Sequence, residues 1–64
     1  MIVEQILEII VDIDEFHIES EDELRLYSID LIDNIVADFG NRKVVAISFY
    51  EDVYNDKICS IKIK

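Results

Sequence analysis

The chain must build a stable fold from 64 residues without an internal disulfide, because Cys59 is its only cysteine. A chain of this length buries only about 60% of its unfolded surface, so natural domains of this size need dense packing, a metal or a partner. Hydrophobic residues make up 52% of the sequence, which favours dense packing or a partner surface. With no proline, one glycine and no repeat, the sequence shows no linker. We therefore expect a single compact domain over residues 1–64.

Residues 2–11 have the apolar spacing of an amphipathic helix. At about 100° per residue, five aliphatic side chains share one side of this helix: Ile2, Ile6, Leu7, Ile9 and Ile10. Three acids, Glu4, Glu8 and Asp12, fall together on the other side at spacings of four residues. Residues four apart are separated by about 6 Å along a helix axis. The pattern predicts a regular ladder of carboxylates along the first helix.

A second, longer helix is predicted over residues 21–38. Ser20-Glu21-Asp22-Glu23 matches the capping box, with Ser20 as the N-cap. Gly40 is the expected left-handed residue after the helix. The expected apolar face consists of Leu24, Leu31, Ile32, Ile35, Val36 and Phe39. The opposite face consists of Asp22, Glu23, Asp30, Asp33 and Asn34, with Leu26 among them and Tyr27 at their edge.

The remaining segments predict strands. Residues 43–50 are rich in β-branched and aromatic residues and would place Val45, Ile47 and Phe49 on one face. Residues 57–63 alternate, with Cys59, Ile61 and Ile63 inward, and Asn55-Asp56 favours a turn between the two strands. For residues 13–18 we favour a short strand with a bulge near Glu15, the alternative being an irregular loop. The predicted fold class is α+β, with two amphipathic helices packed on a small antiparallel sheet that ends in a C-terminal β-hairpin.

The acids are concentrated in the first forty residues. Residues 1–40 contain twelve Asp and Glu against one base, Arg25, a balance of −11. Residues 41–64 contain three acids against five bases, a balance of +2, so that the whole chain has a net charge of −9. Such a charge opposes binding to nucleic acid and to anionic lipid. It indicates instead a protein partner with a basic surface.

Several classes of protein are disfavoured by what the sequence lacks. No apolar run is long enough to span a membrane, and the first residues carry Glu4 and Glu8 where a signal peptide has bases. A single thiol is typical of a reducing compartment, so we expect a cytoplasmic protein. We find no catalytic or cofactor motif. We therefore expect a protein that is not an enzyme and binds neither a cofactor nor a metal.

Three smaller features have a structural interpretation that is simpler than a functional one. Asp12, Asp14 and Glu15 could bind calcium, but the glycine of a calcium-binding loop is absent, so solvated acids are the favoured interpretation. His17 could sense pH through a neighbouring carboxylate, although a lone histidine is more often structural. Cys59 would need an activating base to act as a nucleophile, and we expect it to be a small buried hydrophobic residue.

One stretch has a family resemblance. Tyr27-Ser28-Ile29-Asp30, followed by Ile32, Ile35 and Phe39-Gly40, resembles the sequence around the phosphopantetheine-bearing serine of acyl and peptidyl carrier proteins. The resemblance covers roughly residues 20–40, and Tyr27 stands where that family has an aspartate. It implies a small, acidic, all-helical domain that docks on basic surfaces of partner enzymes. Ser28 would then be the attachment site.

The leading functional hypothesis is a non-enzymatic protein-binding module that inhibits or regulates a basic nucleic-acid-binding protein. A ladder of carboxylates can imitate the phosphate array that such proteins recognise. Phage-type anti-defence inhibitors, immunity proteins and antitoxins are analogous in type, although no motif connects this chain to them. The expected partner-binding residues are Glu4, Glu8, Asp12, Asp22, Leu26, Tyr27, Asp30 and Asp33. The alternatives are a divergent carrier protein modified at Ser28 and a small structural homo-oligomer such as a homodimer. The acids could also serve only to keep the domain soluble, although solubility needs a net charge of only about 2–8 in magnitude.

Overall fold

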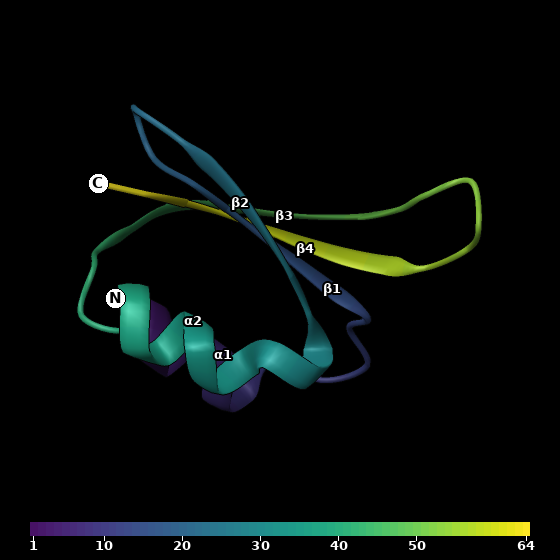
Figure 1. Cartoon of the computed structure of the whole chain (residues 1–64), viewed down its shortest axis with the longest axis horizontal. Helices are drawn as coiled ribbons and strands as arrows, with labels where there is room; N and C mark the ends of the chain where they lie inside the picture. Colours follow the sequence, from purple (N-terminus) through teal and green to yellow (C-terminus); the bar gives the residue numbers. More distant parts are fainter.

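The fold is α+β, with two helices on one side of a four-stranded mixed sheet (Figure 1). The computed structural model describes all 64 residues. In chain order the elements are α1 (Val3–Ile9), β1 (Glu15–Glu19), β2 (Leu24–Ser28), a 3₁₀ turn η1 (Ile29–Leu31), α2 (Ile32–Phe39), β3 (Val44–Glu51) and β4 (Lys57–Ile63). The strand order across the sheet is β2-β1-β4-β3, so β2 and β3 are the two edges.

The sheet is mixed, and the prediction of a purely antiparallel sheet is wrong. Each local hairpin, β1–β2 and β3–β4, is antiparallel, but the two central strands β1 and β4 are parallel. Adjacent strands joined by a tight turn must be antiparallel, whereas strands joined by a long crossover can be parallel. β1 and β4 are separated in sequence by β2, α2 and β3, which form that crossover.

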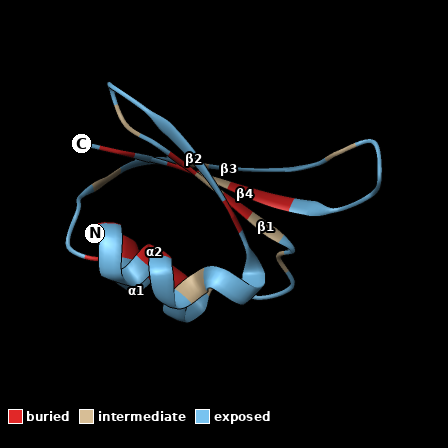
Figure 2. Ribbon diagram, in the orientation of Figure 1, coloured by how far each residue is buried: buried red, intermediate tan, exposed pale blue.

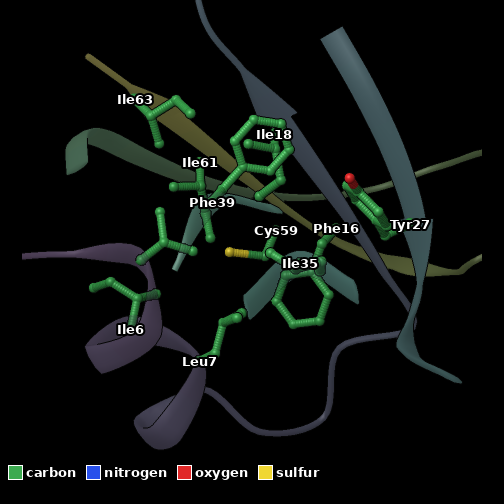
Figure 3. Close-up of a cluster of buried hydrophobic side chains, with 11 residues drawn as sticks. Ile6, Leu7, Phe16, Ile18, Tyr27, Ile35, Phe39, Cys59, Ile61 and Ile63 are labelled. Atoms are coloured by element: carbon green, nitrogen blue, oxygen red, sulfur yellow. The ribbon is translucent and has the colours of Figure 1, made fainter. Parts of the chain in front are cut away.

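The core lies between the helices and one face of the sheet (Figures 2 and 3). Its eleven buried residues are Val3, Ile6 and Leu7 of α1, Ile35 and Phe39 of α2, and Phe16, Ile18, Tyr27, Cys59, Ile61 and Ile63 of the sheet. The predicted inward positions on β4 are confirmed, since Cys59, Ile61 and Ile63 are at most 2% exposed. The predicted pairing of the last two strands is also present, because β3 and β4 lie side by side at the C-terminal end of the chain.

The predicted helix over residues 21–38 is wrong for its first half. Residues 24–28 form β2, and α2 begins only at Ile32. Ser20 closes the β1–β2 turn instead of capping a helix, and its N–H donates to the Glu23 carbonyl at 2.9 Å. Pairing with β1 decides the outcome, because it places Tyr27 opposite Phe16 on the covered face.

Gly40 is not the left-handed cap that the sequence suggested. Its φ and ψ are −51° and −35°, which are right-handed helical values. Its N–H donates to the Val36 carbonyl, and a Cβ at this position would lie only 2.5 Å from that carbonyl oxygen. Close approach of the backbone, rather than a positive φ, is what requires glycine here.

The first helix is shorter than predicted. α1 ends at Ile9, Ile10 is extended, and Asp12 has a positive φ of 61°, so Asp12 is not part of the predicted ladder. Ile9 was expected on the apolar face but is 68% exposed. The strand predicted near residues 13–18 is confirmed as β1, although its pairing is regular on both sides and shows no bulge.

The sheet's irregularity lies in β3 instead. The β3–β4 register shifts between Val44 and Ala46. Val44 therefore packs against the core together with Ile47, although strict alternation predicted that these two side chains would lie on opposite faces.

Candidate protein-binding surfaces

The helical layer presents an acidic surface. Glu4 and Glu8 on α1, Asp30 in η1 and Asp33 on α2 are all exposed, and none of these three elements contains a lysine, arginine or histidine. Glu4 and Glu8 lie one helical turn apart, as predicted from their spacing. We call the side of α1, η1 and α2 that faces away from the sheet the helical acidic surface.

Apolar side chains are exposed on these same elements. Ile9 is 68% exposed, Leu31 43% and Val36 37%. Charge increases the rate and specificity of association, while buried apolar and aromatic contacts supply most of the binding free energy. The helical acidic surface therefore combines both kinds of contact that a protein partner needs.

Arg25, the single base among the first forty residues, is paired with acids of its own domain. The Arg25 Nε lies 3.1 Å from a Glu23 carboxylate oxygen, and its Nη1 lies 3.5 Å from Asp38 Oδ2. Its guanidinium also lies over the Phe39 ring, 5.6 Å from the ring centroid. Arg25 is therefore directed towards its own neighbours and does not offset the charge of Glu4, Glu8 or Asp33.

The eight residues predicted to bind a partner do not share one surface. Glu4, Glu8, Asp30 and Asp33 belong to the helical acidic surface, whereas Asp12 lies in the loop after α1 and Asp22 in the β1–β2 turn. Leu26 is 57% exposed but lies on the sheet face that points away from the helices, because its strand neighbour Tyr27 points towards them. Tyr27 is only 7% exposed, and its hydroxyl donates to Asp38 at 3.0 Å, so it is not available to a partner.

The acids of the β1–β2 turn face bases. A polar hollow between this turn and the C-terminal part of the chain is lined by Ser20, Glu21, Asp22, Glu23, Arg42 and Lys64. Two bases thus stand opposite three acids at this place. The acids of this turn therefore lie near two bases, although no ion pair joins Asp22 to Arg42 or Lys64.

The open face of the sheet contains the only histidine. His17 Nδ1 and the Tyr50 hydroxyl are 2.8 Å apart, with the direction of the hydrogen bond depending on the histidine tautomer. His17 Nε2 lies 3.5 Å from a Glu15 carboxylate oxygen and has no hydrogen-bond partner. Leu24 and Leu26 of β2 are more than half exposed on the same face. The hydrogen bond between His17 and Tyr50 connects β1 with β3, and this contact favours a structural role for the histidine.

A groove lies between the loop after α1 and the far end of the β3–β4 hairpin. It has a volume of about 390 Å³ and is lined by Val11, Asp12, Ile13, Phe49, Tyr50, Glu51, Lys57 and Ile58. Phe49 is 62% exposed and Val11 75%. Sequence reasoning missed this groove. The predicted helices over residues 2–11 and 21–38 would have covered the strands, whereas the observed helices have only seven and eight residues.

Carboxylates gather at the same end of the hairpin. Asp52 Oδ1 accepts the N–H groups of Tyr54 and Asp56 at 2.8 and 3.0 Å, and Asp14 Oδ2 accepts the Lys57 N–H at 2.8 Å. The charge of Asp52 raises the pKa of Asp56, with smaller contributions from burial, Asp14 and Glu15. The structure contains no cluster of side chains arranged to hold a metal ion. The acids at this end therefore repel one another.

Neither Cys59, the candidate nucleophile, nor Ser28, the candidate attachment site, lies in surroundings that suit these roles. Cys59 is fully buried, and burial raises its pKa to about 11, so its thiol is protonated at neutral pH. The expectation of a small buried hydrophobic residue is confirmed. Ser28 is the exposed last residue of β2, directly before η1. Its surroundings are not the all-helical domain that the resemblance to carrier proteins implies.

Comparisons with protein-family models, with curated proteins and with solved structures found no match for this chain. Neither helix is long and apolar enough to cross a membrane.

Proposed function

We propose that this chain is a small, non-enzymatic protein-binding module that binds and regulates a basic, nucleic-acid-binding protein through its helical acidic surface. One observation carries the proposal. α1, η1 and α2 expose Glu4, Glu8, Asp30 and Asp33 without a single base among them, and the nearby Arg25 is held by Glu23 and Asp38.

The proposed mechanism is occlusion combined with charge competition. Carboxylates spaced about 6 Å apart along α1 would occupy positions that phosphates occupy on the partner. Exposed Ile9 and Val36 would pack against apolar parts of the partner and slow dissociation. While bound, the module would exclude nucleic acid from the partner's basic surface. Because the attraction between exposed charges is screened by salt, affinity should fall steeply as ionic strength rises.

Two triple variants with the same change in net charge test the proposal. The first, Glu4→Gln, Glu8→Gln and Asp33→Asn, neutralises the helical acidic surface. The second, Glu19→Gln, Glu21→Gln and Asp22→Asn, neutralises exposed acids on β1 and in the β1–β2 turn. Each variant is immobilised and exposed to an extract of the source cells at low and at high salt, and duplex DNA is then added as a competitor.

We expect the wild type and the second variant to retain the same basic proteins at low salt and to release them on addition of duplex DNA. The first variant should retain none of them. Equal losses in both variants would show that only total charge matters. Retention that survives high salt and added DNA would exclude competition for a phosphate-binding surface.

A further inference from the structure

Residues 47–51 form the second half of β3, an edge strand, and alternate residues in this half point their backbone N–H and C=O groups away from the sheet. The N–H of Asp52 donates to Asp56 across the hairpin, and both the N–H and the C=O of Lys57 are bonded to Asp14 on the other side of β4. Successive residues of a strand point their backbone groups in opposite directions. The β3–β4 register therefore directs the N–H and C=O groups of Ile47, Phe49 and Glu51 away from β4.

The chain already uses this edge for one short pairing. The Val44 N–H donates to the Met1 carbonyl, the Val3 N–H donates to the Arg42 carbonyl, and Ile2 forms an antiparallel bridge with Lys43. Residues 1–3 thus lie beside the start of β3 as an added strand would. They leave residues 47–51 of the same edge uncovered.

The uncovered part of the edge adjoins the groove. Phe49, Tyr50 and Glu51 line both, and the turn between β3 and β4 projects past the ends of the helices (Figure 1). β3 is exposed along nearly its whole length (Figure 2). Backbone groups that accept a further strand, next to a hollow that accepts a side chain, are the two components of peptide recognition by strand addition.

Charge defines the kind of segment that would fit. Asp12 and Glu51 line the groove, Asp14, Asp52 and Asp56 lie around the same end of the hairpin, and Lys57 is the only base there. An incoming Lys or Arg beside Glu51 would relieve the repulsion that these acids exert on one another. A second copy of this chain would bring its own net charge of −9 to the same place.

We propose that residues 47–51 of β3 and the adjacent groove bind an extended segment of a partner protein, which pairs with β3 as a fifth strand, places an apolar side chain in the groove and sets basic residues beside Glu51. The proposal rests on the proposed function only for the basic character of the partner. It names a second contact, separate from the helical acidic surface.

The test uses a blocked peptide of sequence VTVTVKK, titrated into the whole ¹⁵N-labelled chain and followed by NMR. Two control peptides are VTVTVEE, which reverses the terminal charge, and VTPTVKK, whose proline removes one N–H donor from the pairing. The matched protein variants are Phe49→Thr and Val45→Thr, which change two β3 residues that are 62% and 59% exposed, only the first of which lines the groove. Circular dichroism verifies that both variants are folded.

We expect VTVTVKK to shift the amide signals of Ile47, Phe49 and Glu51 and to slow their hydrogen exchange. Phe49→Thr should weaken binding about tenfold, as expected for the loss of an anchoring side chain, while Val45→Thr leaves it within about twofold. The pKa of Asp56 should fall on binding, because the peptide's lysines offset the charge of Asp52. Neither control peptide should reproduce these changes.

Four results would overturn the proposal: no binding of VTVTVKK, equal binding of VTVTVEE, shifts confined to α1 and α2, or self-association of the free chain that Phe49→Thr abolishes. The last would make a second copy the occupant of this edge. These outcomes are independent of the extract experiment. Loss of retention in the helical variant without peptide binding at β3 would leave the proposed function standing, and the reverse pattern would leave only the strand-addition site.

Discussion

The two edges of the sheet, β2 and β3, present different barriers to further strand pairing. β2 has five residues, follows the acids Glu21, Asp22 and Glu23, and is connected to α2 through Tyr27 and Arg25, both of which contact Asp38. β3 has eight residues and is uncharged from Val44 to Tyr50. No helix contact of this kind holds the far half of β3.

Natural sheets discourage edge pairing with short strands, charged side chains and covering elements. β2 is short, contains the charged Arg25, and contacts α2 through Arg25 and Tyr27. β3 is longer and has such features only at its ends, where residues 1–3 pair with its start and Glu51 is its last residue. An edge that remains long and apolar is either a hazard for aggregation or a place where something binds. The contrast between the two edges favours β3 as the edge at which a partner strand would pair.

The largest expected effect comes from removing the side chain that attaches β2 to the core. Tyr27→Ala should lower the free energy of unfolding by about 3–5 kcal/mol, because it leaves a cavity between β2 and Phe39. Tyr54→Ala, at a residue that is 81% exposed, should change it by less than about 0.5 kcal/mol. Urea unfolding followed by circular dichroism measures both. Equal effects would mean that β2 is not held more firmly than the β3–β4 turn.

A smaller change should follow when only the hydroxyl of Tyr27 is removed. Tyr27→Phe keeps the ring in place but removes the hydrogen bond to Asp38, and it should lower the free energy of unfolding by about 1 kcal/mol. Tyr54→Phe, whose hydroxyl makes no hydrogen bond within the chain, is the matched control and should have no measurable effect. The same urea titrations suffice. A neutral Tyr27→Phe would show that packing alone connects β2 to α2.

The open edge should tolerate substitution. Phe49→Thr keeps a residue that favours strands, and we expect it to alter the free energy of unfolding by no more than about 0.5 kcal/mol, because Phe49 lies outside the core cluster. Thermal and urea unfolding measure this effect. A loss comparable to that of Tyr27→Ala would mean that the far half of β3 stabilises the domain, and that its exposure is not evidence of a binding role.

The smallest effect concerns the acids at the end of the open hairpin and depends on pH. The pKa of Asp56 is raised above 3.8 in the folded chain, mainly by Asp52, so the folded state binds this proton more tightly than the unfolded state. Stability is therefore lost as pH rises from 3.8 through the folded pKa. Asp56→Asn should stabilise the chain at neutral pH and lose this advantage below pH 3.8.

Unfolding titrations of Asp56→Asn and of a remote control, Glu8→Gln, at several pH values measure this difference. A gain for Asp56→Asn that persists at low pH would have to come from the turn conformation and not from charge. A gain of equal size for Glu8→Gln would reflect the total charge of the chain instead of the local repulsion at the hairpin end.

Alternation in residues 57–63 was sufficient to predict the central strand β4. Cys59, Ile61 and Ile63 are apolar at every second position, and no helical period fits them, so their burial followed from the pattern alone. The first helix was predicted for a similar reason, although its end was placed two residues too late. Ile10 and Val11 continue the apolar run without continuing the helix, because the chain must turn there to enter β1.

Residues 24–28 are the instructive failure. Leu24-Arg25-Leu26-Tyr27 fits a strand and a helix about equally well, and the capping-box pattern at Ser20 favoured the helix. A capping box adds only a local contribution, whereas pairing with β1 adds a ladder of backbone hydrogen bonds and buries Tyr27 against Phe39. The partner-binding residues assigned to that helix were scattered over three surfaces as a consequence.

The sequence by itself determined where the acids lie along the chain, which segments alternate, and that Cys59 occupies an inward position of one such segment. These are properties of residue type and local period, which are readable from the residues in order. The tertiary structure alone decided which acids share a surface, that β1 and β4 are parallel, and that β3 ends as an open edge beside a groove. Those outcomes depend on contacts between segments far apart in the sequence, such as that between Asp14 and Lys57, which are 43 residues apart, and no local pattern records such contacts.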